Sequence, residues 1–257
     1  VEPGQSPVLP DFYVKPTFNA LTLAVALAGI TVLKVQAAET IDVMVLYTDE
    51  AGLSDPAAAI NAHISYANTV VKNSEVGINF RVVHSQKINF TNDSAVNISA
   101  LYSLANNSTV AQLREEHGAD LVTIITNRVD SSCGIGFLPR SNANSDQLGS
   151  SAERVAFSVV GRGCNTAMIH EFGHNMSLGH SYAQDSVGSI WDWARGHGIN
   201  GKFVTAMAYT NAYNTNNRVP YFSNPALSNC DNLLCGKDIN DTDGANSALA
   251  LNRIATQ

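Results

Sequence analysis

The sequence predicts an α/β fold in which helices cover a mostly parallel, twisted β-sheet. Short apolar segments rich in β-branched residues alternate with segments of helical periodicity, the order expected of such a fold. One of them, residues 120–126 (DLVTIIT), is almost continuously apolar, as is typical of a central strand buried on both faces. The chain has 257 residues, of which 45% are hydrophobic, and this is enough to bury a sizeable core.

The first part of the predicted sheet consists of two strands and the helix between them. Residues 41–47 (IDVMVLY) are predicted to form a buried strand. A helix should then begin with Asp55 as its N-cap and Pro56 at its first position. Its apolar face repeats at helical spacing and comprises Ile60, Ile64, Ala67 and Val71. Gly77 ends this unit, and residues 78–83 (INFRVV) are predicted to form the second strand.

The next elements continue the alternation. Residues 98–116 carry one or two helical patterns that end at Gly118, just before the central strand. Residues 154–160 (RVAFSVV) are predicted to form another strand. Beyond residue 180 the pattern weakens into loops rich in glycine and asparagine.

The last predicted element is a helix over residues 245–254, capped by Asp241 or Asp243. The segment before it, residues 238–244 (DINDTDG), hints at a calcium site. It departs from the EF-hand template, because Ile239 occupies the first ligand position. A turn with a helix cap is therefore favoured, and calcium stays possible but unsupported.

Composition excludes several classes of function. The net charge of −7 makes a nucleic-acid binder with a basic face improbable on electrostatic grounds. The ordinary apolar share and the charged share of 14% exclude an intrinsically disordered chain. No apolar run has the length of a membrane-spanning helix, so we expect no stable membrane insertion of the mature chain.

The four cysteines predict two disulfides. Their number is even and none lies in a CxxC pair, which favours an oxidising compartment over a zinc knuckle. We favour the pairs Cys133–Cys164 and Cys230–Cys235, although four cysteines allow three pairings. Four unpaired buried thiols are the alternative.

The first forty residues differ in character from the rest. Residues 21–33 (LTLAVALAGITVL) are apolar and are followed by small residues up to Ala38, which favours a secretory signal peptide. A pro-segment remnant, or an ordered apolar element packed on the domain, is the alternative. We therefore predict a leader or pro-segment over residues 1–40 and a catalytic domain over residues 41–257.

The strongest functional signal is the sequence HEFGHNMSLGH, residues 170–180. His170 and His174 lie four residues apart, so on a helix both imidazoles face one side and can reach one zinc ion. His180 follows and can supply a third ligand, which leaves an open position for water. Glu171 then points to the bound water and can act as general base. The alternative is that these histidines only cap and line a polar helix.

This pattern is similar to that of the metzincin zinc peptidases, whose signature is HExxHxxGxxH followed by a Met-turn. Ser177 stands where the signature has glycine, which puts the turn after the helix in doubt. The resemblance implies one catalytic zinc, and Met207 as the apolar floor beneath the zinc ligands; an ordinary core methionine is the alternative. It also makes Tyr209 a candidate to ligate zinc or to stabilise the transition state, against a tyrosine that only packs nearby.

From residue 41 onward the chain looks like a bacterial, secreted member of the reprolysin (adamalysin)-like group. The segments that carry this likeness are residues 120–126, 133–138, 157–164 and 220–225. The likeness implies a metzincin-like α/β (α+β) fold with an upper lobe over residues 41–176. A smaller irregular lower lobe over residues 177–257 would hold the Met-turn and the C-terminal helix. It also implies a substrate-binding edge strand comprising Gly134, Ile135, Gly136 and Phe137.

The resulting expectation is a secreted, monomeric zinc endopeptidase. It would hydrolyse internal bonds of an extended polypeptide by zinc-activated water. A catalytically silent, zinc-bound adhesion or binding module is the first alternative, and the intact Glu171 argues against it. A metal hydrolase of non-peptide bonds is the second.

Overall fold

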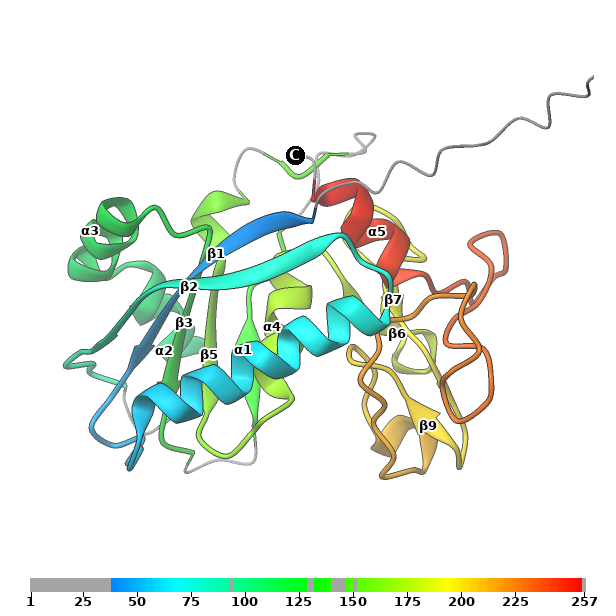
Figure 1. The fold of residues 1–257 in the computed structure, drawn as a ribbon, viewed down its shortest axis with the longest axis horizontal. Helices are drawn as coiled ribbons and strands as arrows, with labels where there is room; N and C mark the ends of the chain where they lie inside the picture. The colour runs from blue at the N-terminus through cyan, green and yellow to red at the C-terminus, as the bar shows by residue number, and fades with distance from the viewer. Residues whose placement is uncertain (1–37, 93–94, 129–131, 140–146, 150–151, 256–257) are drawn as a thin grey trace, which may run out of the picture. The chain divides into compact units, whose positions relative to one another are not determined.

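A five-stranded sheet forms the centre of the fold in the computed structural model, which describes residues 38–92, 95–128, 132–139, 147–149 and 152–255 (Figure 1). Its strand order is β2-β1-β3-β5-β4. Four strands run parallel, and β4 pairs antiparallel with β5 at the edge. The strands are β1 (Glu39–Tyr47), β2 (Ile78–Lys87), β3 (Leu121–Thr126), β4 (Gly134–Gly136) and β5 (Phe157–Gly161).

Helices cover both faces of this sheet. On one face, α1 (Pro56–Asn73) and α4 (Ala167–Asn175) enclose one apolar cluster, and on the other α2 (Ile98–Ala105) and α3 (Ser108–His117) enclose a second. Alternate residues of β1 point into the two clusters, because successive strand side chains face opposite ways. The helix α4 packs against β4 and β5 and also contacts α1, which packs against β2 and is drawn in cyan in Figure 1.

The predicted α/β order is confirmed, and one helix start agrees closely. Asp55 accepts a hydrogen bond from the amide of Ala58 at 3.0 Å, and Pro56 is the first residue of α1. Residues 98–116 form two helices, of which the second ends at the left-handed Gly118.

Three predicted boundaries are wrong. β2 continues to Lys87 because β1 pairs with it along its whole length. Residues Glu153–Val155 form a 3₁₀ turn, so β5 starts at Phe157 and not at residue 154. The last helix, α5 (Ser247–Ile254), is capped by Asn246, whose side chain accepts from the amide of Leu249 at 2.9 Å. Asp243 pairs with Lys237 instead of capping.

The segment after α4 is irregular, as expected. It contains two small sheets and α5; the strands are β6 (Gly179–Ser181), β7 (Arg195–Gly196), β8 (Gly198–Ile199) and β9 (Phe203–Val204). The Cys230–Cys235 disulfide is buried in a third apolar cluster there, and Cys133 is bonded to Cys164. Both pairs are those favoured from the sequence.

The predicted leader is only partly covered by the structure. Residues 1–37 lie outside the described residues, whereas Glu39 and Thr40 already belong to β1. The first strand begins at Glu39, whose amide donates to the carbonyl oxygen of Gly77 at 2.8 Å. Among the described residues, no helix has the length and apolar character needed to cross a membrane.

Candidate metal centre

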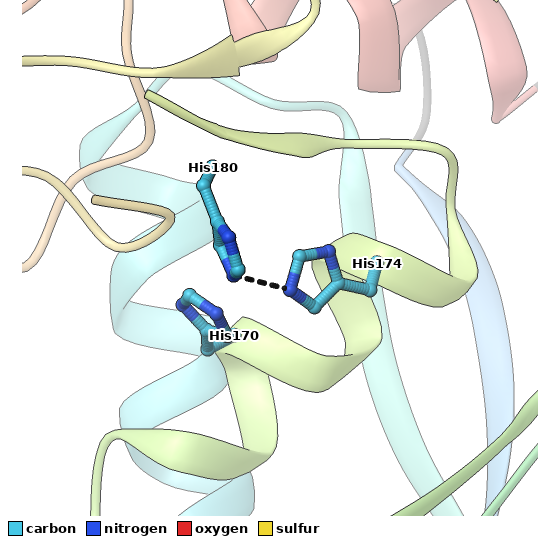
Figure 2. Close-up of side chains that lie close together, drawn as sticks. All are labelled: His170, His174 and His180. Atoms are coloured by element: carbon cyan, nitrogen blue, oxygen red, sulfur yellow. Dashed lines mark hydrogen bonds between the residues drawn. The ribbon is translucent and has the colours of Figure 1, made fainter. Parts of the chain in front are cut away.

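The three predicted histidines come together at one point. His170 and His174 project from consecutive turns of α4, and His180 reaches them from β6 (Figure 2). One ring nitrogen of each histidine lies within 4.8 Å of a ring nitrogen of the other two. Within the described residues, these three histidines form the group that could hold a metal ion.

Backbone carbonyls orient two of these rings. Nδ1 of His170 lies 2.7 Å from the carbonyl oxygen of Ala206, and Nδ1 of His174 lies 2.8 Å from that of Leu178. A carbonyl only accepts, so the proton sits on Nδ1 of both rings and each Nε2 carries a lone pair. The ring orientation therefore suits coordination through Nε2.

The Nε2 atoms of the two helical histidines face the centre of the group. Among the described residues, Nε2 of His170 is buried with no hydrogen-bond partner, and Nε2 of His174 lies 3.0 Å from Nε2 of His180 (Figure 2). With the proton of His174 on Nδ1, this contact is a hydrogen bond only if Nε2 of His180 donates, and a metal ion bound by both nitrogens would take the place of that proton. The donor set, three imidazoles with room for a further ligand, fits one catalytic zinc ion.

The electrostatics keep the three rings neutral. Burial, together with the neighbouring rings, lowers the pKa of His174 to about 4 and that of His170 well below its usual value. Burial also lowers the pKa of His180. Neutral imidazole is the form that binds a metal, so the site is ready to coordinate at neutral pH.

Ser177 makes the turn that brings His180 to the helix. Its φ is +72°, the left-handed region that glycine adopts at the end of helices, and its amide donates to the carbonyl of His174 at 2.9 Å. Serine in place of the signature glycine is therefore accommodated at the cost of local backbone strain. The hydroxyl of Ser177 is buried and finds no hydrogen-bond partner in the part of the chain that the structure describes, which adds to this cost.

Met207 lies fully buried beneath the zinc helix. A Cβ added to Gly173 would collide with Sδ of Met207 and lie 3.1 Å from its Cε. Gly173 is therefore the residue that lets the methionine approach the backbone of α4 between the two helical ligands. Sequence reasoning named Met207 but missed Gly173, since the contact joins distant segments.

Glu171 is 4% exposed and faces the edge strand. Burial raises the pKa of its carboxyl group to about 8. A Cβ added to Gly134 would lie 2.8 Å from Cδ of Glu171, and one added to Gly136 would lie 3.2 Å from Oε2. The two glycines of β4 therefore make room for this carboxylate.

Asn175 of α4 holds the edge strand β4 in place through hydrogen bonds. Its Nδ2 donates to the carbonyl oxygens of Phe137 and Phe157 at 2.9 and 3.0 Å. The Cys133–Cys164 bond ties the start of β4 to the loop that precedes α4. Gly134, Ile135 and Gly136 form the strand itself, and Phe137 follows it.

Tyr209 lies beside the histidines but remains 43% exposed. Its ring centroid is 4.4 Å from that of His180 and 5.6 Å from that of His170. Burial of its hydroxyl and the nearby Glu171 carboxylate raise the pKa of Tyr209, so the phenol stays protonated and can donate a hydrogen bond.

A cavity of about 540 Å³ opens beside the site, and its lining includes His170, Glu171, Tyr209 and Arg218. Arg218 donates from Nη1 to the carbonyl oxygen of Ala206 at 2.8 Å, the same oxygen that orients His170. Sequence reasoning missed Arg218, because nothing in the local sequence marks a lone arginine in a loop.

Comparison with known proteins finds similarity to one family of metallo-peptidases. The model of the reprolysin-like metallo-peptidase family M12B matches residues 57–181. A protein of Pseudomonas aeruginosa named peptidyl-Asp metalloendopeptidase is 36% identical over 267 residues, which cover 95% of this chain. The chain spans 43% of the length of that relative.

A solved structure described as a chaperone–substrate complex has the same fold. It superposes with a TM-score of 0.63 at 20% identity, covering 84% of this chain and 33% of that one.

Proposed function

Since the chain is metzincin-like and carries the reprolysin-like domain of metallo-peptidase family M12B over residues 57–181, we propose that it is a zinc-dependent endopeptidase. The observation that carries this proposal is the three-histidine group with Glu171 buried beside it. A binding module has no use for a buried carboxyl group, which is costly to bury.

When bound by His170, His174 and His180, zinc supplies an acidic water and polarises the scissile carbonyl group. Glu171 takes the proton of the attacking water and delivers it to the leaving amine. Burial raises the pKa of this carboxyl group to about 8, which suits the second of these roles, delivery of the proton to the amine. Tyr209 donates a hydrogen bond from its hydroxyl to the oxyanion.

The substrate is proposed to be an extended polypeptide that adds to the free edge of β4. That strand pairs with β5 on one side only, so its other side offers backbone groups to a peptide. The relative from Pseudomonas aeruginosa is named for peptidyl-Asp bonds, and we propose that this chain also cleaves at aspartate.

Cleavage of casein by the zinc-loaded full chain tests the catalytic proposal, with Glu171→Gln alongside. The amide cannot act as a base, so we expect activity to fall by about a hundredfold or more at an unchanged zinc content of about one per chain. Glu116→Gln is the matched control, because it makes the same substitution at an exposed glutamate on α3, and it should keep full activity.

Two results would contradict this proposal. Equal activity of Glu171→Gln and wild type would remove the assigned role of Glu171. Zinc binding by wild type without cleavage of any protein substrate would favour the catalytically silent adhesion or binding module.

We propose that this activity is extracellular and that the protein is a monomer. Its catalytic domain would consist of two lobes that meet after residue 176, with the substrate bound between them. Two disulfides support an oxidising compartment, since such bonds are rare where thiols are kept reduced. Thiol titration of denatured protein isolated from culture medium should find no free cysteine, and sedimentation should give the monomer mass. Free thiols, or protein confined to the cytosol, would contradict secretion.

A further inference from the structure

The cavity beside the metal centre carries one positive charge. Its lining is otherwise neutral apart from Glu171, and it is formed by the start of β4, the start of α4 and the segment after Met207. Polar lining residues are Ser132, Thr166, Thr210 and Asn211. The volume of about 540 Å³ is in the range of pockets that accept a side chain or a small ligand.

Arg218, which supplies that charge, is half-buried and has no anionic partner among the described residues. Its two hydrogen bonds both start at Nη1 and end on the carbonyl oxygens of Thr205 and Ala206. Burial lowers the pKa of the guanidinium group, whereas Tyr66 and Tyr209 raise it.

A guanidinium group that has lost part of its water and forms no ion pair with a described residue is costly for the folded protein. Its planar fork matches a carboxylate, with which it forms two parallel hydrogen bonds. Nε and Nη2 of Arg218 make no hydrogen bond among the described residues and remain available for such a partner.

The position of the cavity along the edge strand indicates which substrate residue enters it. The cavity lies at Ser132, Cys133 and Gly134, where β4 begins, whereas a second cavity of about 290 Å³ follows the strand to Leu138. A peptide that adds antiparallel to β4 has its C-terminal part at the beginning of that strand.

Resting on the proposed endopeptidase function, we propose that Arg218 selects an acidic side chain on the substrate residue that follows the scissile bond. The carboxylate enters the cavity and pairs with Nε and Nη2 of the guanidinium group. Arg218 also donates to the carbonyl oxygen that orients His170, so an occupied pocket is linked directly to a metal ligand.

The test is a set of quenched peptides that differ at one central residue, which is aspartate, glutamate, asparagine or leucine. For the wild-type full chain we expect kcat/KM to be at least tenfold higher for aspartate than for asparagine, with cleavage before that residue by mass spectrometry. In Arg218→Gln the ratio should fall to within about threefold of one. In Arg218→Lys, which keeps the charge but not the fork, it should be intermediate.

Lys202→Gln is the matched control, because it removes one positive charge from an exposed turn after β8 and should keep the wild-type ratio. The ratio within each variant separates specificity from general damage to the metal centre, which would slow all four peptides alike. If Arg218→Gln fails to bind zinc, the aspartate-to-asparagine ratio of kcat/KM measured for Arg218→Lys tests the inference.

Several outcomes would overturn the inference while leaving the peptidase function intact. They are an unchanged aspartate-to-asparagine ratio in the Arg218 variants, equal cleavage of all peptides by wild type, or cleavage after the acidic residue. A wild-type chain that cuts neither the peptides nor casein would instead refute the proposed function itself.

Discussion

Gly134→Ala should disable the proposed general base without touching a metal ligand. The new Cβ would lie 2.8 Å from Cδ and 2.9 Å from Cγ of Glu171, and would collide with Oε1. Carbon atoms in ordinary contact are about 3.5–4.0 Å apart, so the carboxyl group must move by roughly 0.7–1 Å or the strand must shift. Glu171 is 4% exposed, and the space into which it can be displaced is the cavity that it lines, away from its present position.

A displacement of about 1 Å at a catalytic group costs on the order of a hundredfold in rate, which is the loss we expect in kcat. Zinc content should stay at the wild-type value, since the three histidines are unaffected. Gly77→Ala is the matched control, because its Cβ would lie 3.5 Å from Oδ1 of Asn252, an ordinary contact. It should retain full activity.

Steady-state kinetics on one peptide substrate, together with metal analysis, check this reasoning. A kcat within about threefold of wild type at full zinc content would refute it. A rise in KM alone would show that the methyl group obstructs the peptide at the edge strand and does not displace the base.

Three further predictions concern stability. Gly173→Ala drives a methyl group into Met207, and equilibrium unfolding in urea should show a loss of about 1–3 kcal/mol, whereas an unchanged midpoint would contradict the close contact. Ser177→Gly relieves a left-handed backbone and removes an unsatisfied hydroxyl, so the free energy of unfolding should rise by about 1 kcal/mol; a decrease would show that the turn is not strained. Burial, and then Lys237, lowers the pKa of His197 to about 4 against an opposing effect of Asp243. The folded state therefore binds fewer protons, and this contribution is complete above about pH 6.5 and lost as the pH falls towards 4. His197→Gln should flatten the stability profile in that window by up to about 3 kcal/mol, with a residual slope from buried His63, and a profile parallel to wild type would argue against it.

Much of the site could be predicted because its signals are local. The spacing of His170 and His174 places both rings on one side of α4 through helix geometry alone, and the cap at Asp55 uses a side chain three residues from its partner. The central strand could be recognised because a strand buried on both faces must be apolar throughout.

Local signals misled where a distant residue competes for a side chain. Asp243 has the chemistry of a helix cap, yet Lys237 holds its carboxylate and Asn246 caps α5 in its place. The turn at Ser177 was in doubt for a related reason. A serine adopts a left-handed conformation only when packing and the hydrogen bond from its amide to the carbonyl oxygen of His174 compensate for the strain, and neither is visible in the sequence.

By itself, the sequence determined the α/β alternation, the three histidines of the metal centre and the glutamate proposed as the base, because each depends on contacts within a few residues. Only the tertiary structure decided what surrounds them: the Ala206 carbonyl on His170, the glycines that admit Glu171 and Met207, and Arg218 in the adjoining cavity. These contacts join segments far apart in the chain. They arise when the sheet, α4 and the irregular C-terminal segment pack together, which no local periodicity or spacing encodes.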